Sequence, residues 1–304
     1  MRIGLNGGAS SIERFIEQAQ TAEAEGFSSL WYPSAIAGDP VAAMAAAGRA
    51  TSSIELGTAV LQSYTSHPVL QANRMAGAAF AMGRAGLTLG IGPSHAPVID
   101  GMYGMSYDTP GRHTEEYVEI VTTLLRGERV DVDGAEYTVR GVQAAPSPFP
   151  VQVLIAALAP RLLRVAGAVA DGTILWMANA RAIESHVAPH IGKAAADAGR
   201  PSPRIVAGLP VAMHDDVAEA RAVAARQFAI YGQLPNYQRI LEHGDAPGPA
   251  EAAIVGDEAA VADQLQALIA AGATDVWAAV FPVGDDASGS RQRTRTLLRE
   301  LAAS

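Results

Sequence analysis

The sequence predicts a single (β/α)₈ barrel, in which eight parallel strands alternate with helices, and three observations support this prediction. The chain has 304 residues, which suits a barrel of about 250 residues with insertions. Short runs rich in Val, Ile and Leu alternate with amphipathic stretches, as buried parallel strands and their covering helices do. One joint also recurs: a glycine is followed four or five residues later by a tryptophan, in 26–31, 172–176 and 272–277.

The eight predicted strands are the short, nearly continuous apolar runs of the chain. They are Arg2–Asn6, Ser29–Pro33, Ile54–Leu61, Gly86–Gly92, Val151–Ala157, Thr173–Ala178, Arg204–Met213 and Asp275–Phe281. The stretches between them have the helical period, and Phe15, Ala19 and Ala22 share one face of the first helix. Asp257 is the expected N-cap of the helix before the last strand. Each joint glycine is expected to end a helix with a positive φ.

Two segments interrupt the alternation within what we take to be one domain, residues 1–304. In 127–142, Asp133-Gly134 lies between alternating apolar residues, which is a hairpin signal. We expect a β-hairpin insertion there. The second segment, 231–256, is rich in Pro, Gly and Asn. It is expected to form a lid or an oligomer contact, and a plain surface excursion fits it equally well.

The composition excludes several functional classes. Because the chain has no cysteine, it cannot form disulfides, thiolate–zinc sites, iron–sulfur clusters or a cysteine nucleophile. A net charge of −9, without a Lys/Arg stripe, disfavours nucleic-acid binding. No run of about 18 apolar residues predicts a membrane span, and the N-terminus enters a strand directly. We therefore expect a cytoplasmic protein whose partner is a small-molecule substrate, with no nucleic-acid or membrane partner.

Small residues dominate the C-terminal ends of the predicted strands, where barrel active sites lie. They are most frequent after the third, fourth and fifth strands, in 57–60, 90–95 and 156–159. Glycine and alanine let a flat or phosphorylated ligand approach the backbone closely. The pocket is expected to be mostly apolar, with Tyr32, Tyr64, Trp176 and Met177 as candidate walls.

The turn after the fifth strand is a candidate phosphate site. Ala156 to Ala159 leads to Pro160, which suits the first turn of a helix. The free N–H groups and the dipole of that helix would favour an anion, and Arg161 would add charge. On spacing alone, an ordinary capped turn is the better interpretation.

His95 is the candidate catalytic residue, because it follows a strand that carries Gly90 and Gly92. It could act as a general acid or as a hydrogen-bond donor to substrate, or be a loop histidine without a catalytic role. Gly90-Ile91-Gly92 is not a dinucleotide fingerprint, because its third glycine position is His95. His186 and His190 lack a third ligand, so we expect a solvated pair and no metal site.

The order of these motifs resembles the luciferase-like monooxygenase superfamily and, within it, the coenzyme F420-dependent oxidoreductases. The residues that carry the resemblance are Gly26–Trp31, Leu56–Val60, Leu89–His95, Ile155–Pro160, Ala170–Thr173 and Ala271–Asp275. Together they span nearly the whole chain.

The resemblance implies a luciferase-like barrel, commonly a homodimer, that binds F420 or FMN with its ring over the end of the third strand. It implies a cis peptide at Ala59–Val60 and a cofactor phosphate on the turn 156–159. The cofactor-binding residues it suggests are Asn6, Thr58, Ala59, Val60, Gly92, Ser94, Ala156, Ala157, Leu158, Ala159, Arg161 and Trp176.

The sequence also departs from the dehydrogenases of this superfamily. Pro33-Ser34 stands where sugar-phosphate and alcohol dehydrogenases carry Asp-His, and His95 stands near the glutamate of the former. These changes favour a reductase, in which reduced F420 delivers hydride to a C=C, C=N or C=O bond. An FMN-dependent monooxygenase is the alternative on the same fold, and a non-catalytic deazaflavin-binding protein is the alternative of another class. A metal-dependent hydrolase or aldolase would need carboxylates, histidines or a lysine at strand ends that are nearly bare of them.

Overall fold

Eight parallel strands form a closed ring in the computed structural model, which describes residues 1–33, 38–144 and 146–303. This ring confirms the predicted barrel. Its order is β1-β2-β3-β5-β8-β9-β10-β12, and β12 pairs again with β1. The strands are β1 Ile3–Asn6, β2 Ser29–Tyr32, β3 Glu55–Thr58, β5 Leu87–Gly92, β8 Val151–Ile155, β9 Gly172–Trp176, β10 Arg204–Met213 and β12 Asp275–Val280.

The predicted third strand is divided in two. β3 ends at Thr58, a cis peptide follows between Ala59 and Val60, and β4 (Leu61–Gln62) continues along β5 with Leu61 opposite Ile91. The expected cis bond is therefore present. A further short strand, β11 (Ile254–Gly256), lies parallel to the end of β10.

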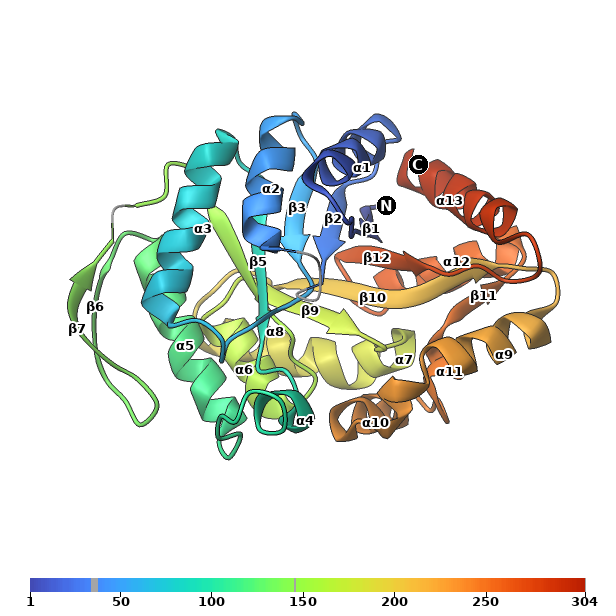
Figure 1. Cartoon of the computed structure of the whole chain (residues 1–304). Coiled ribbons are helices and arrows are strands. Elements are labelled where there is room, and N and C mark those ends of the chain that lie inside the picture. The colour runs from blue at the N-terminus through green and yellow to red at the C-terminus, as the bar shows by residue number, and fades with distance from the viewer. Residues whose placement is uncertain (34–37, 145, 304) are drawn as a thin grey trace.

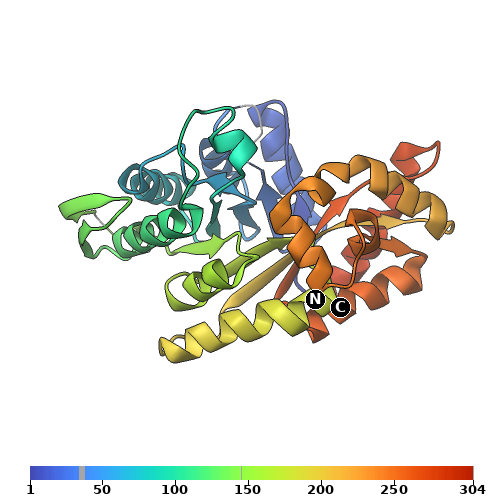
Figure 2. The same ribbon diagram turned by 90° about the horizontal axis from the view of Figure 1, so that it is seen from below.

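Helices surround the ring on its outer side (Figures 1 and 2). The long ones are α1 Ile12–Ala24, α2 Pro40–Arg49, α3 Pro68–Met82, α5 Pro110–Leu125, α6 Pro160–Ala168, α8 Ala188–Asp197, α9 Val217–Gln227, α12 Glu258–Ala270 and α13 Ala287–Ala303. The remaining helical elements lie in the loops: α4 Ala96–Ile99, α7 Ala180–Ala182, the π-helix Ile183–Val187, the 3₁₀-helix Ala229–Gln233, α10 Pro235–His243 and α11 Pro249–Ala252. Asp257 caps α12 as predicted, by accepting the N–H of Ala260.

A two-stranded antiparallel hairpin of β6 (Arg129–Asp133) and β7 (Thr138–Gln143) covers most of the insertion expected at 127–142. The hairpin projects from the ring beside α5 (Figure 1). Val130 and Val139 pack against Ile120 and Leu124 of α5. The carboxylate of Glu116 in α5 accepts the backbone N–H groups of residues 135–137, so the hairpin turn is fixed to the same helix.

The three joint glycines have the predicted positive φ, with values of 85° at Gly26, 153° at Gly172 and 112° at Gly272. At Gly172 a Cβ would lie 1.9 Å from the carbonyl oxygen of Arg204, so only glycine fits there. Each joint places a tryptophan in β2, β9 or β12, as predicted.

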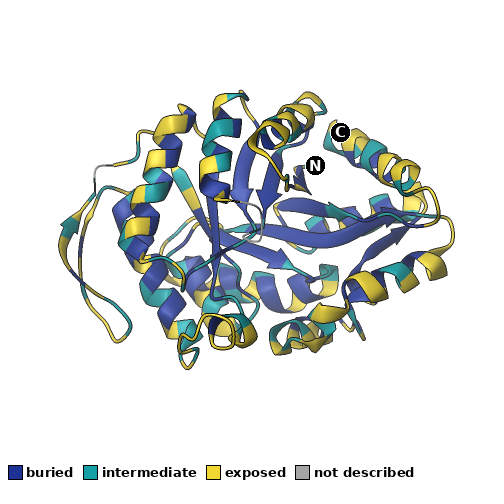
Figure 3. Ribbon diagram, in the orientation of Figure 1, coloured by how far each residue is buried: buried dark blue, intermediate teal, exposed yellow. Residues whose placement is uncertain are grey.

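Two of these tryptophans, Trp31 and Trp277, fill the interior of the barrel. They are buried with Leu154, Ile174 and Val206 in one cluster, and the strands around them are buried (Figure 3). Glycine on a neighbouring strand provides the space for each indole ring. A Cβ on Gly57 would lie 2.3 Å from Trp31, and a Cβ on Gly208 would lie 2.0 Å from Trp277. Large and small side chains thus alternate across the core.

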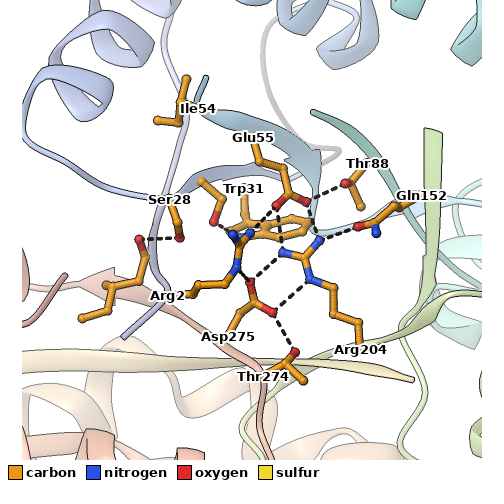
Figure 4. Close-up of polar contacts among 12 residues, drawn as sticks. Arg2, Ser28, Trp31, Ile54, Glu55, Thr88, Gln152, Arg204, Thr274 and Asp275 are labelled. Atoms are coloured by element: carbon orange, nitrogen blue, oxygen red, sulfur yellow. Dashed lines mark hydrogen bonds and ion pairs between the residues drawn. The ribbon is translucent and has the colours of Figure 1, made fainter. Parts of the chain in front are cut away.

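A group of ion pairs joins strands at the N-terminal end of the barrel (Figure 4). Arg204 of β10 donates to both carboxylate oxygens of Glu55 in β3, at 2.7 and 2.8 Å, and to those of Asp275 in β12, at 2.9 and 2.7 Å. Arg2 donates to the same two carboxylates. Burial alone would raise the pKa of Asp275, but hydrogen bonds and charge from Arg204 outweigh it and hold that pKa below its usual value.

Arg204→Met is expected to lower the free energy of unfolding by about 3 kcal/mol, because it leaves two buried carboxylates without most of their counter-charge. Urea unfolding followed by circular dichroism at pH 7 measures the change. Arg126→Met is the matched control, since Arg126 forms an exposed pair with Glu128 and should change stability by less than about 1 kcal/mol. Equal stability changes in the two variants would contradict this account.

Candidate functional site

A cavity of about 620 Å³ lies at the C-terminal ends of the barrel strands, within the size range of small-molecule pockets. It contains most of the residues predicted from the sequence. The predicted residues that line it are Asn6, Ala59, Val60, Gly92, Ser94, His95, Ala156, Leu158, Ala159, Arg161 and Trp176. Pro33 also lines the cavity, and Ser34 lies outside the described residues.

Thr58 and Ala157, also predicted to bind cofactor, do not line the cavity. The Thr58 hydroxyl donates to the carbonyl of Gly90 at 2.7 Å and accepts its N–H at 3.0 Å, so it ties β3 to β5. Ala157 is fully buried behind the turn that it belongs to. Thr58 and Ala157 therefore lie behind the cavity surface, next in sequence to residues that line it.

Of the four residues that the sequence predicted as cavity walls, three do not line the cavity. Successive strand residues point to opposite faces, so Trp31 points into the barrel while Tyr32 stacks on Phe15 of α1, with ring centroids 3.9 Å apart. Tyr64 stacks on His113 at 3.7 Å, and Met177 is fully buried outside the cavity. Only Trp176 is a wall.

Small side chains form one side of the cavity. Ala59 and Val60 belong to the segment between β3 and β4, and Gly92 and Ala156 follow on the next two strands. A Cβ on Gly92 would lie 3.0 Å from the Cβ of Ala156 and 3.2 Å from Val60 Cγ2. This surface is therefore closely packed, and it leaves room for a flat group against the backbone.

The turn 156–159 leads directly into α6, whose N-cap residue Ala159 makes no side-chain cap. Pro160 occupies the first helical turn, so the N–H groups of the next residues are available at the positive end of the helix dipole. Arg161 lines the cavity beside them and forms a half-exposed ion pair with Glu115 at 2.6 Å. This donor set fits a phosphate group.

His95 lies between the end of β5 and α4. Its side chain makes no cap on α4, and its ring nitrogens have no hydrogen-bond partner among the described residues. The loop that holds it is fixed by the Tyr107 hydroxyl, which donates to the carbonyl of Ser94 at 2.6 Å. Burial lowers the pKa of His95, so the imidazole is neutral at pH 7 and can donate one hydrogen bond.

Sequence reasoning missed the wall contributed by residues 227–239. The 3₁₀-helix and α10 bring Tyr231, Asn236, Tyr237 and Arg239 to the cavity. We call the four rings of Trp277, Trp176, Tyr231 and Tyr237 the aromatic wall, because successive centroids are 5.0, 5.6 and 5.0 Å apart. The predicted insertion 231–256 is largely helical, and its two tyrosines were the available signal.

Contacts at the far end of α10 hold it against the segment after β9. Asn179 donates its side-chain amide to the carbonyl of Gly244 at 2.9 Å, and Arg181 pairs with Asp245 at 2.6 Å. The ring of His243 stacks on that of His186 at 3.9 Å.

His186 is itself not solvated, which contradicts the expected solvated pair. It lies buried in the π-helical turn Ile183–Val187. Its Nε2 lies 2.8 Å from the carbonyl oxygen of Leu158, in the turn that lines the cavity. Its role in the described structure is therefore to connect that turn to α10.

The charge of the cavity is also distinctive. Among the described residues that line it, the ionisable side chains are His95, three tyrosines and two arginines, with no carboxylate or lysine. No group of His, Asp or Glu suited to a metal ion occurs in the described part of the chain. No described helix is long and apolar enough to span a membrane.

A closed barrel with a ligand cavity at the C-terminal strand ends is the arrangement of barrel enzymes. The family described as luciferase-like monooxygenase matches residues 2–275, so the chain belongs to that family. A 5,10-methylenetetrahydromethanopterin reductase from Methanolobus tindarius is 26% identical over 289 residues, covering 94% of this chain and 87% of the relative.

Solved structures with the same fold include a reductase and a monooxygenase. The coenzyme F420-dependent tetrahydromethanopterin reductase of Methanopyrus kandleri has a TM-score of 0.73 at 19% identity, covering 99% of this chain and 97% of that one. An EDTA monooxygenase from Chelativorans sp. BNC1 has a TM-score of 0.77 at 16% identity, covering 99% and 94%. At these identities the likeness establishes the fold.

The imidazole of His95 is expected to titrate below the ordinary histidine value of about 6.5, because burial disfavours its charged form. Nuclear magnetic resonance of ¹³C-labelled histidine, with His95→Gln to assign the signal, measures this pKa. A pKa at or above 6.5 in the protein without ligand would contradict the described environment.

Proposed function

We propose that this oxidoreductase binds coenzyme F420 and, with the coenzyme reduced, delivers hydride to a small organic acceptor. The observation that carries the proposal is the make-up of the cavity. It joins a backbone surface of small residues, a helix N-terminus with an arginine, and a neutral histidine, without a carboxylate. The similarity of nearly the whole chain to a methylenetetrahydromethanopterin reductase supports it.

The described residues fit such a coenzyme in two parts. Ala59, Val60 and Gly92 offer a surface against which a flat ring can lie. The turn 156–159 and Arg161 offer N–H and guanidinium donors for a phosphate. The bound coenzyme would supply hydride chemistry, while the protein binds the acceptor, orients it and excludes water.

The similarity to a reductase and the side chains near the ring surface support the reductive direction. Oxidation of an alcohol requires a base to take its proton, and no carboxylate or lysine lines the cavity among the described residues, which leaves the imidazole of His95 for that role. Reduction requires a donor toward the acceptor heteroatom, which the neutral imidazole of His95 provides. We therefore favour reduction of a C=C, C=N or C=O bond.

An FMN-dependent monooxygenase is the second candidate, because the phosphate donors suit FMN equally well and the family description includes monooxygenases. It would consume oxygen when supplied with reduced FMN. A deazaflavin-binding protein without catalysis would bind F420 tightly and turn over no acceptor.

We also propose a cytoplasmic homodimer. Helix α3 exposes Leu70 and Phe80, which are 61% and 75% accessible, and Gly77 between them has no neighbour within 4 Å of a built Cβ. Such an apolar helix face is typical of a protein contact. Multi-angle light scattering should give twice the chain mass, and Phe80→Glu should shift it towards the monomer. A monomeric mass for the unmodified protein contradicts the dimer.

Fluorescence titration with F420 tests the binding site. Arg161→Ala should weaken F420 binding about threefold to tenfold, since a partly exposed charge-assisted hydrogen bond to phosphate is lost. Arg164→Ala is the matched control, because Arg164 lies on the same helix and outside the cavity lining. If the unmodified protein binds FMN and not F420, the proposed cofactor is wrong.

A further inference from the structure

Two polar side chains face the cavity from opposite elements without a partner in the protein. His95 follows β5, and Tyr237 lies on α10, with ring centroids 5.7 Å apart at an angle of 51°. Neither the imidazole nitrogens nor the tyrosine hydroxyl has a hydrogen-bond partner among the described residues. Both side chains are half-buried and line the same cavity, so a ligand bound there would have both polar groups within reach.

Both groups are neutral donors. Burial lowers the pKa of His95 and raises that of Tyr237 well above its usual value. Each can therefore present one N–H or O–H at pH 7. A carbonyl oxygen has two lone pairs and can accept both bonds at once, whereas an alkene offers no acceptor.

The cavity wall that continues from Tyr237 is aromatic, with the Tyr231 ring at 80° to that of Tyr237 and at 69° to that of Trp176. Tyr231, Trp176 and Trp277 extend the aromatic wall from Tyr237 to the end of β12. Aromatic rings pack best against planar groups. Asn179 and Arg181 hold the other end of α10 through Gly244 and Asp245 and so fix the position of the helix that carries Tyr237.

We propose that His95 and Tyr237 together bind the carbonyl oxygen of a planar conjugated acceptor, so that the substrate class is α,β-unsaturated carbonyl compounds. This inference rests on the proposed function for its chemistry. It adds Tyr237, which sequence reasoning did not identify, as a catalytic residue.

The reaction then balances as follows. A hydride adds to the β-carbon, the C=C pair shifts, and the carbonyl oxygen becomes an enolate oxygen held by the His95 N–H and the Tyr237 O–H. The Tyr237 hydroxyl donates a proton to the enolate oxygen and regains one from solvent, and the resulting enol gains a proton at its α-carbon as it loses that of its oxygen, which gives the saturated ketone. The acceptor gains a hydride and a proton, and the reduced coenzyme is oxidised by two electrons. Donors aimed at the oxygen where charge develops favour this step.

Binding of benzylideneacetone to the protein without coenzyme tests the proposal independently of activity. Isothermal titration gives its Kd, and infrared difference spectroscopy with a ¹³C=O label gives the carbonyl stretch. The chain has no cysteine, and Lys193 lies outside the cavity lining, so neither a thiol nor that amine is placed to react covalently with an enone bound in the cavity.

Tyr237→Phe and His95→Ala should each raise the Kd of benzylideneacetone about twofold to tenfold and shift the stretch to higher frequency. Binding of trans-1-phenylbut-1-ene, which lacks the carbonyl, should be unchanged, as should the Kd of F420. Tyr103→Phe, an exposed tyrosine outside the cavity, is the control and should behave as the unmodified protein.

An unchanged Kd and stretch in both variants, or no binding of benzylideneacetone to the unmodified protein, overturns the proposal. The failure of F420 to bind would instead overturn the proposed cofactor, because the carbonyl measurements are made without it.

Discussion

Arg204 joins strands that lie far apart in the sequence, and the position of the cavity depends on this connection. Its guanidinium bridges Glu55 of β3 and Asp275 of β12 at the N-terminal end of the ring. The three strands are not all neighbours in the sheet, so the ion pairs fasten the ring across its interior. Backbone pairing then fixes the opposite ends of the strands, where the small residues, the helix N-terminus of α6 and His95 face one cavity.

Side-chain packing inside the barrel and at the C-terminal ends of its strands determines the shape of the cavity. Trp31 and Trp277 fill the interior only because Gly57 and Gly208 have no side chains in their way. At the C-terminal ends of the strands, the small side chains of Gly92 and Ala59–Val60 leave space for the cavity. Helix α10 contributes an aromatic ring to its side wall. The site therefore combines a rigid backbone surface with a side wall that depends on the loop after β10. In barrel enzymes such loops are where substrate preference varies.

The sequence predicted those parts of the molecule that depend on local pattern. The eight strands follow from apolar runs, and the residues at their C-terminal ends face the cavity because strand ends define that face. The predicted third strand was too long because the break at Ala59–Val60 has no apolarity signal of its own. Tyr32 was assigned to the wrong face because the direction of its side chain depends on the pairing register. Tyr237 and Arg239 were missed because α10 is positioned by long-range contacts, such as Asn179 with Gly244.

The central claim is that the cavity uses a reduced deazaflavin to transfer hydride and does not use reduced FMN to activate oxygen. Anaerobic stopped-flow absorbance, with the protein and reduced F420 mixed with benzylideneacetone, tests it most directly. The account predicts reoxidation of F420 that requires both the protein and the acceptor and produces the saturated ketone. Oxygen-dependent product formation with reduced FMN, and no reoxidation of reduced F420 by any acceptor, would contradict it.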